Sequence, residues 1–262
     1  MVKDLAYQYF GIVLKNLRIN SLNDYYSSGI LNDIIPGPWR ELILKKLTDL
    51  ICNKTVFIFG AGPSLEESIY EIKYFYSSVT FISANGATEF LLKNSILPHI
   101  VVTDLDGNIE AIEEALRRGS VIVVHGHGDN ILNILKYVPK FKGNVIGTTQ
   151  LIPWGSLVNF GGFTDGDRAL YLALYFGARK IVMFGMDFGD IVGKYSKPWL
   201  KKNVKIWDVK RKKFLIAKEL IEKAAGKFKD KVEIYIAPRN VENIKYVLEI
   251  KYDSLGSIIG KN

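Results

Sequence analysis

Little cysteine, little histidine and no long apolar run set the first limits on this sequence. The single cysteine, Cys52, excludes an internal disulfide and any metal site built from cysteines alone. The three histidines are too few for the dinuclear zinc site that the motif HGHGDN (125–130) would need. No apolar run approaches the roughly 18–20 residues of a membrane span. The first residues show no signal-peptide cleavage pattern, so we expect a reduced, cytoplasmic protein of enzyme size.

Basic charge is present, but it is confined to one stretch. Residues 194–213 contain nine Lys or Arg and one acid, whereas basic and acidic residues cancel over the rest of the chain, so the net charge of +8 is local. Such a segment attracts polyanions, and both RNA and a nucleoside triphosphate are polyanions. Residues 186–210 have little periodicity, which predicts a mobile loop that covers a site. In the simpler interpretation these lysines only form a solvated face.

From residue 54 onward, short apolar runs alternate with segments of helical period. Most of these runs are continuously apolar, as expected for strands that are covered on both faces. The alternation predicts an α/β fold with a doubly wound, mainly parallel, Rossmann-like sheet. The predicted strands are 55–60, 79–84, 99–104, 121–126, 144–149, 180–185 and 231–237, and the predicted helices lie near 64–77, 108–118, 129–138, 165–177 and 211–226.

The beginning of the chain has a different pattern. Residues 1–50 are mostly of helical character, interrupted by IIPGPW (34–39). We predict an N-terminal helical segment over 1–50 that packs as a layer on the core, followed by an α/β catalytic domain over 51–262 with a basic loop at 190–213.

Polar and glycine-rich motifs follow most of the predicted strands. In open parallel sheets, ligands bind at the carboxyl ends of the strands, where such loops meet. One loop of this kind is ordinary, but several on one edge predict a shared site. The motifs are GAGPSLEE (60–67), ANGA (84–87), TDLDGN (103–108), HGHGDN (125–130), GGFTDGDRA (161–169) and GMDFGD (185–190).

The first motif favours a phosphate contact without matching a known phosphate loop. Gly60 and Gly62 would allow the backbone to approach a phosphate at a helix N-terminus. The dinucleotide fingerprint is incomplete, because Leu65 replaces its third glycine, and the Gly-Lys-Ser/Thr end of a Walker loop is missing. Ser64 and Glu67 are predicted to form a capping box.

The third motif places two carboxylates one residue apart at the end of a strand. Side chains at i and i+2 of an extended chain point the same way, so Asp104 and Asp106 would approach one cation. Hard oxygen ligands suit Mg²⁺ or Ca²⁺, and Mg²⁺ with phosphates is the better fit, because the EF-hand pattern fails. In the structural alternative, Asp106 or Asn108 caps the next helix.

A second aspartate pair and two histidines complete the candidate residues. Asp165 and Asp167 stand at a helix start, where the dipole favours carboxylates and where Asp165 would also pair with Arg168. One of the two aspartates is explained by capping alone. The histidines of HGHGDN would bind phosphate or orient a substrate, and Asp129 would do the same or cap the following helix.

Taken in order, these motifs resemble the archaeal 6-hydroxymethyl-7,8-dihydropterin pyrophosphokinases, the MptE-like family. The resemblance covers roughly residues 36–190. TDLDG and FTDGDRALYLALYFGARKIVMFG are also distantly similar to the thiamine pyrophosphokinases. Gly107 stands where those enzymes have a serine, and their glycine-rich β domain has no counterpart here, so their substrate is not carried over.

The resemblance implies Mg²⁺-dependent transfer of diphosphate from ATP to the hydroxymethyl group of the reduced pterin, with AMP and the pterin diphosphate as products. It assigns Mg²⁺ to Asp104 and Asp106, with Asp165 or Asp167 as a further ligand or a base that orients the hydroxyl. Arg168 and the basic loop would contact the triphosphate. The remaining assignments are Gly60, Gly62, Ser64 and Asn85 to the nucleotide or phosphate pocket, His125, His127 and Asp129 to phosphate or pterin, and Asp187 beside Phe188 to the pterin.

Two other functions remain open at this point. One is a glycosyltransferase-like enzyme that uses a nucleotide-sugar, because related α/β folds linked to sugar transfer look similar around GAGPSL. The other is an RNA-binding module in which the basic segment grips the backbone and Trp199 and Trp207 stack on bases. The carboxylates argue against RNA, since they repel phosphate unless a cation intervenes. We therefore expect ATP and a reduced pterin as partners, and no membrane and no nucleic acid. A homo-oligomer stays open.

Overall fold

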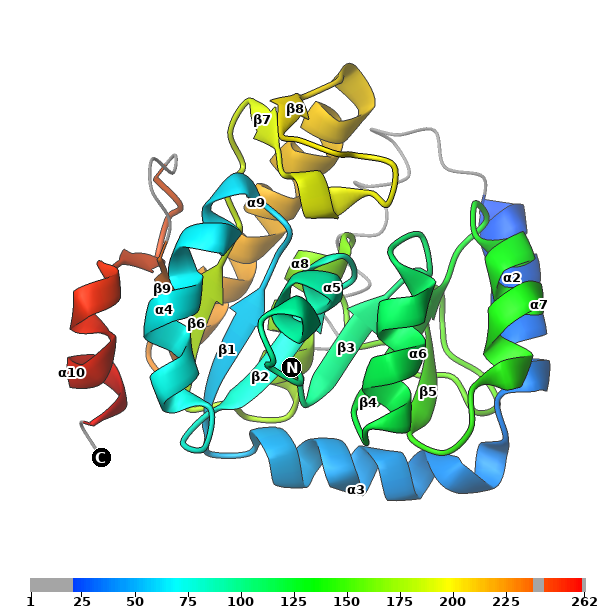
Figure 1. Ribbon diagram of the computed structural model, residues 1–262. Helices are drawn as coiled ribbons and strands as arrows, with labels where there is room; N and C mark the ends of the chain where they lie inside the picture. The colour runs from blue at the N-terminus through cyan, green and yellow to red at the C-terminus, as the bar shows by residue number, and fades with distance from the viewer. Residues whose placement is uncertain (1–20, 238–242, 261–262) are drawn as a thin grey trace.

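The computed structural model describes residues 21–237 and 243–260, and its centre is one sheet of eight strands. The strand order is β10-β9-β6-β1-β2-β3-β4-β5, and every neighbouring pair is parallel. This confirms the predicted α/β fold with a mainly parallel sheet (Figure 1). The strands are β1 (Thr55–Phe59), β2 (Thr80–Ala84), β3 (Ile100–Thr103), β4 (Val121–Gly126), β5 (Val145–Thr149), β6 (Lys180–Phe184), β9 (Glu233–Ile236) and β10 (Leu248–Glu249).

Helices cover both faces of this sheet. Alternate side chains of β1 point to opposite faces, because successive residues of a strand do so. Val56 and Ile58 join the core under α8 and α9, whereas Phe57 and Phe59 join the core under α4, α5 and α10. The helices are α2 (Ser21–Ile34), α3 (Arg40–Ile51), α4 (Ile69–Ile72), α5 (Ala87–Lys93), α6 (Ile109–Arg117), α7 (Ile131–Tyr137), α8 (Asp165–Tyr175), α9 (Asp208–Phe228) and α10 (Leu255–Ile259).

The helical segment before β1 packs directly on the core. Leu31 and Ile35, in and just after α2, pack in one apolar cluster with strands β3 to β5 and with α6 and α7. Helix α3 runs along the edge where the strands begin (Figure 1), and the Thr80 hydroxyl donates to the Leu50 carbonyl there. Residues 1–20 of the predicted segment lie outside the described residues. The division into two parts stays a prediction.

One predicted helix is broken and its predicted cap is absent. The stretch 64–77 consists of η2 (Pro63–Ser68), α4 and η3 (Lys73–Phe75), of which η2 and η3 are 3₁₀ turns. The capping box of Ser64 and Glu67 was therefore a wrong prediction, since Gly62 is the N-cap residue and has no side chain to offer. Ser64 instead bonds to a distant carboxylate, described below.

The basic segment is more ordered than the predicted mobile loop. It contains the 3₁₀ turn η5 (Lys194–Ser196), the strand β8 (Val204–Lys205) and the first turns of α9, and β8 pairs antiparallel with β7 (Ile191–Val192) just before the segment. It lies above the carboxyl ends of β1 and β2 (Figure 1). In the described part of the chain, no helix is both long and apolar enough to cross a membrane.

The order of the strands creates a switch point between β1 and β6. From β1 the chain builds the sheet outward through β2, β3, β4 and β5, and β6 then returns to the other side of β1. In such sheets the loops on the two sides of the switch diverge and leave a crevice at the carboxyl ends. That edge is where the polar motifs lie.

Candidate active site

A pocket of about 470 Å³ opens at the carboxyl ends of the central strands. Every strand from β1 to β6 contributes to it, because parallel strands place their following loops at the same edge. Residues far apart in the sequence thus line one cavity. The residue from each strand end, in sheet order, is Gly185 after β6, Gly60 after β1, Asn85 after β2, Asp104 after β3, His125 in β4 and Gln150 after β5.

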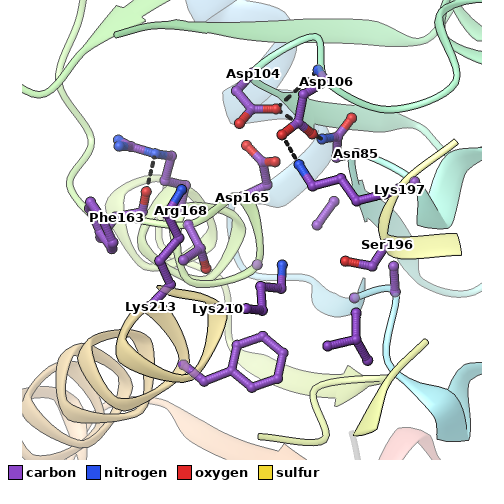
Figure 2. Close-up of a pocket in the computed structure, with 18 of the residues that line it drawn as sticks. Asn85, Asp104, Asp106, Phe163, Asp165, Arg168, Ser196, Lys197, Lys210 and Lys213 are labelled. Carbon is purple, nitrogen blue, oxygen red and sulfur yellow. Dashed lines mark hydrogen bonds and ion pairs between the residues drawn. The ribbon is translucent and has the colours of Figure 1, made fainter. Parts of the chain in front are cut away.

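Asp104 and Asp106 lie side by side among the lining residues of this pocket (Figure 2). The amide Nδ2 of Asn85 donates to Oδ1 of Asp104 at 2.9 Å and to Oδ1 of Asp106 at 2.6 Å. The extended geometry predicted for this pair was wrong: β3 ends at Thr103, and Leu105 between the aspartates has a left-handed φ of 65°. The bridging amide and this turn bring the carboxylates together, and the alternation of an extended strand does not.

The alternative role of Asp106 as a helix cap is excluded. Asn108 is the N-cap residue of α6, and its side chain accepts a hydrogen bond from the Ala111 amide at 3.2 Å. Gly107 between them has no space for a side chain, because a Cβ would meet the amide of Asn85. The departure from serine at this position therefore has a local steric reason.

Asp165 is the third carboxylate at this place. It starts α8 and points toward Asp104 and Asp106 (Figure 2). Burial and the charges of those two aspartates raise the pKa of Asp165 well above its usual range, and burial and the charge of Asp104 raise the pKa of Asp106. Burial acts the same way on Asp104 and is the largest single effect there, but interactions with His127, Asp106 and Lys197 together outweigh it and lower the pKa of Asp104. The cluster therefore has excess negative charge that a cation would stabilise.

Lysines of the basic segment supply part of that positive charge. Lys197 forms an ion pair with Asp106, and Lys210 and Lys213 enter the pocket from α9 (Figure 2). Burial and the charge of Lys197 lower the pKa of Lys210 to about 8. The two tryptophans point elsewhere: Trp199 is 69% exposed and Trp207 is 39% exposed. The segment thus has one side that faces the pocket and one that faces solvent.

Asp167 caps a helix from a buried position, and its predicted role in catalysis stays a prediction. It is fully buried, and its carboxylate accepts hydrogen bonds from the backbone amides of Phe163 at 2.5 Å and Thr164 at 2.8 Å. With Thr164 it forms a capping box at the start of α8. Arg168 lines the pocket, but Nε donates to the Phe163 carbonyl at 3.2 Å. Its predicted pairing with Asp165 is therefore replaced by a bond to the backbone.

The HGHGDN motif lines the pocket beside the carboxylates. Nε2 of His127 lies 3.4 Å from Oδ2 of Asp104, whereas His125 is 1% exposed and bonds through Nδ1 to Oγ1 of Thr148 at 3.0 Å. Asp129 lies on the rim and is exposed. The predicted alternative of Asp129 as a cap was wrong, because Asn130 is the N-cap residue of α7.

The glycines after β1 line the pocket, but their amides are already used. The Gly60 amide donates to the Phe184 carbonyl and the Gly62 amide to the Gly185 carbonyl, each at 2.8 Å. A Cβ on Gly60 would lie 2.6 Å from the Gly185 carbonyl oxygen. Both glycines therefore serve the close contact between the loops after β1 and β6, and a phosphate contact from this loop stays a prediction.

Ser64 stands behind the pocket wall, where it holds Asp187. Its amide donates to Oδ2 of Asp187 at 2.8 Å, and its hydroxyl donates to Oδ1. Burial raises the pKa of Asp187, and the bonds from Ser64 partly offset that increase. Asp187 and Phe188 both line the pocket, so Ser64 positions a lining residue and does not face the ligand itself.

A polar connection that the motifs did not predict reaches the pocket from α2. Asp24 accepts from the Gly128 amide at 2.8 Å and from Nε2 of Gln150 at 2.5 Å, and Gln150 in turn accepts from Arg168 at 3.2 Å. The signal was visible, because the buried face of α2 carries Asp24, Ser27 and Ser28 where an amphipathic helix would be apolar. Buried polar groups of this kind are retained when they have partners.

The oxygen donors fit a magnesium ion that is shared with phosphates. Among residues 21–237 and 243–260, no three carboxylate, imidazole or thiol groups are gathered closely enough to hold a metal ion alone. Mg²⁺ usually binds one or two carboxylates and completes its shell with water and substrate phosphates. The close pair of Asp104 and Asp106, with its excess negative charge, suits that kind of site. A place for Asp165 among the ligands stays a prediction.

The fold resembles that of a known glycosyltransferase. MAf glycosyltransferase from Magnetospirillum magneticum AMB-1 superposes with a TM-score of 0.56 at 17% sequence identity, over 78% of this chain and 34% of that one. At this identity the match shows a common fold only. It agrees with the Rossmann-type arrangement described above.

Sequence comparisons are more specific. A family of proteins described as 6-hydroxymethylpterin diphosphokinase MptE-like matches residues 38–193. A 6-hydroxymethyl-7,8-dihydropterin pyrophosphokinase of Methanocaldococcus jannaschii is 43% identical over 235 residues, covering 86% of this chain and 95% of the relative. A protein of the same name from Methanothermobacter thermautotrophicus is 51% identical over 185 residues, covering 70% and 79%. The chain belongs to the MptE-like family of 6-hydroxymethylpterin diphosphokinases.

Proposed function

We propose that this protein transfers the diphosphate group of ATP to the hydroxymethyl group of 6-hydroxymethyl-7,8-dihydropterin. The hydroxymethyl oxygen forms a bond to the β-phosphorus, and the bond between that phosphorus and the oxygen bridging it to the α-phosphate breaks. AMP leaves with the bonding electron pair, and the hydroxyl proton passes to a base or to water. The names of the relatives support the reaction, and the charge pattern of the pocket supports it independently.

The observation that carries the proposal is the meeting of three carboxylates and three lysines in one pocket. Phosphoryl-type transfer needs mainly positioning and neutralisation of phosphate charge. Lys197, Lys210 and Lys213 supply fixed positive charge around the space in front of the aspartates. Lys210 is half-buried, and this burial together with the charge of Lys197 lowers its pKa, whereas a triphosphate beside it would favour its charged form.

Asp104 and Asp106 would hold Mg²⁺, with Asp165 as a further ligand or as a group that orients the attacking hydroxyl. An ion held by these residues would neutralise phosphate charge. Asn85 keeps the first two carboxylates side by side through its two hydrogen bonds. Lys197 would have to turn from Asp106 toward the phosphates, since ammonium and metal ion compete for the same carboxylate.

The basic segment is anchored so that its lysines face this space. A Cβ on Gly193 would collide with the Ala61 carbonyl, and one on Gly86 would collide with the Tyr195 carbonyl, so the backbones touch at both points. Lys194 also pairs with Glu66 at 2.7 Å. The η5 turn is thus held against the loops after β1 and β2, with Lys197 next to it.

The two other functions considered from the sequence are not favoured. The relatives named above are pyrophosphokinases, and the similarity to a glycosyltransferase shows the fold alone. An RNA surface would have to use Trp199 and the exposed lysines, which lie on the side of the segment away from the carboxylates. The more distant resemblance to thiamine pyrophosphokinases stays a prediction.

Analysis of the nucleotide product tests the reaction. Purified protein is incubated with ATP, Mg²⁺ and 6-hydroxymethyl-7,8-dihydropterin, alongside Asp104→Asn, Asp106→Asn and the control Asp49→Asn on the surface of α3. We expect AMP and pterin diphosphate in equal amounts from wild type and control, with losses of roughly 10²–10³-fold in the two pocket variants. ADP as the product, or no dependence on the pterin, would refute the proposal.

A further inference from the structure

The pocket has two chemically different ends on either side of the carboxylates. Along the sheet, β6 and β1 lie on one side of β2 and β3, and β4 and β5 lie on the other. The end at β6 and β1 carries most of the apolar lining, which is Met186, Phe188, Ile191, Val192 and Phe214, with Asp187 and Lys210 beside it. The end at β4 and β5 is polar, and its lining residues there are Asp24, His125, His127, Gln150 and Arg168.

The reaction itself demands two such ends. The β-phosphorus has to lie at the carboxylates in the middle, and the attacking oxygen and the leaving oxygen lie on opposite sides of it. The adenosine and the pterin therefore occupy opposite ends of the pocket. The question is which end holds which ring.

His125 indicates which ring lies at which end, because its Nε2 atom is available to a ligand. Oγ1 of Thr148 donates its hydrogen to the Val124 carbonyl at 3.1 Å, so it can only accept from Nδ1 of His125. The proton of the neutral ring thus sits on Nδ1, and Nε2 carries a lone pair. Nε2 is buried in a ring that lines the pocket and has no hydrogen-bond partner among the described residues.

The ring is held neutral. Burial and the nearby charge of Arg168 lower the pKa of His125 well below its usual value. A neutral Nε2 accepts hydrogen bonds and repels phosphate oxygens, which are acceptors as well. A buried acceptor without a partner is costly, so a ligand that belongs here brings an N–H or O–H donor.

We propose that Nε2 of His125 accepts a hydrogen bond from a donor group of the reduced pterin, and that the pterin occupies the β4–β5 end. A reduced pterin carries such donors on its pyrimidine ring and on the adjoining reduced ring. The amide of Gln150 is hydrogen-bonded to the carboxylate of Asp24 and to the guanidinium of Arg168. These three groups line the same end of the pocket and can recognise both donors and acceptors of a ligand. This assignment rests on the proposed reaction and makes His125 a residue for substrate specificity.

The three histidines of the chain allow a direct test by nitrogen NMR. In protein labelled with ¹⁵N-histidine, we expect His125 as a neutral Nδ1–H tautomer with an unprotonated Nε2. Adding the reduced pterin should shift that Nε2 resonance upfield, as it does when a lone pair accepts a hydrogen bond. Adding α,β-methylene-ATP with Mg²⁺ alone should leave it in place, while His127, next to Asp104, responds.

A pair of substitutions separates this contact from a merely structural role. His125→Gln keeps an acceptor near the position of Nε2, and His125→Asn keeps only a group near Nδ1 that can still donate to Thr148. We expect His125→Asn to raise KM for the pterin by roughly ten- to a hundredfold with KM for ATP unchanged. His125→Gln should recover most of that loss, and thermal unfolding shows whether either variant is misfolded.

The outcomes distinguish this inference from the reaction on which it rests. If wild type makes AMP with the pterin but the nucleotide alone moves Nε2 of His125, the ends are reversed and the assignment is wrong. If His125→Asn changes KM for ATP and not for the pterin, it is wrong for the same reason. If wild type makes no AMP in response to the pterin, the proposed reaction fails first and this assignment fails with it.

Discussion

The aspartate pair that follows β3 and the pair that begins α8 have the same spacing, but only the first presents both carboxylates to the pocket. Asp104 and Asp106 share the amide of Asn85. At α8, Asp165 faces the pocket, whereas Asp167 caps the helix from within. In a helix, residues two apart point about 200° apart, so one of the two must turn away. A loop with a left-handed residue, Leu105, has no such restriction.

Spacing alone therefore does not define a carboxylate pair. The element on which the residues lie decides whether they act together. The same two-residue pattern produces two pocket carboxylates after β3, and one pocket carboxylate with one structural cap at the start of α8. Substitutions of matched shape can separate the two roles, since Asn has the shape of Asp without its charge.

The largest effect should separate Asp165 from Asp167. We expect Asp165→Asn to lower kcat by roughly 10²–10³-fold, because it removes charge at the phosphate site, while the protein stays at least as stable as wild type. Asp167→Asn should keep most of its kcat and lose about 1–3 kcal/mol of unfolding free energy, because an amide nitrogen would face the Phe163 or Thr164 amides.

Steady-state kinetics and urea unfolding of the same preparations measure both quantities. Asp208→Asn, in the exposed first turn of α9, is the matched control and should change neither quantity much. Equal losses of kcat in the Asp165 and Asp167 variants at full stability would show that both carboxylates act in the chemistry. A purely structural role for Asp167 would then be wrong.

A smaller effect should follow from disturbing the bridge between Asp104 and Asp106. Gly107→Ala places a Cβ against the Asn85 amide, which would have to move away from the carboxylates. We expect kcat/KM to fall by roughly tenfold to a hundredfold, since small displacements of positioning groups have effects of this size. Gly29→Ala is the control, because nothing lies within 4 Å of the Cβ it would add. Full activity of Gly107→Ala would mean that the bridge is dispensable.

Much of the fold could be predicted from the sequence. Continuous apolar runs, such as those of β1 and β4, predict buried strands. These strands end within a residue or two of the predicted bounds. The short elements α5, α10 and β10 were missed, because a few residues carry too little periodicity to separate them from a loop. The ordered pair β7–β8 was missed for the same reason.

Less of the site could be predicted, and the reason is physical. Residues at the ends of parallel strands are brought to one edge by topology, so Asp104, His125 and Asp187 were found. The partner of each side chain depends on tertiary contacts that no local pattern encodes. Ser64 was assigned to phosphate but holds Asp187, and Asp24 was missed because it comes from a helix outside the strand pattern.

The smallest effect concerns the pH dependence of stability, and it bears on Asp165 alone. Burial and the charges of Asp104 and Asp106 raise the folded-state pKa of Asp165, so the folded protein holds this proton more tightly than the unfolded chain. Ionised Asp165 therefore subtracts stability at neutral pH, and the loss is relieved as the pH falls through its folded pKa. Asp104, whose pKa is lowered, has the opposite sign and contributes stability above its usual pKa.

Asp165→Asn carries no charge at any pH, so in EDTA it should be more stable than wild type at pH 7. That advantage should shrink toward zero as the pH falls and wild-type Asp165 takes up its proton. Urea unfolding of both proteins at a series of pH values measures the difference directly. Adding Mg²⁺ and α,β-methylene-ATP at pH 7 should stabilise wild type more than the variant. The Asp165 carboxylate, which destabilises the fold without a cation, would then bind one. A stability difference that does not change with pH would mean that Asp165 is not repelled by the aspartates beside it.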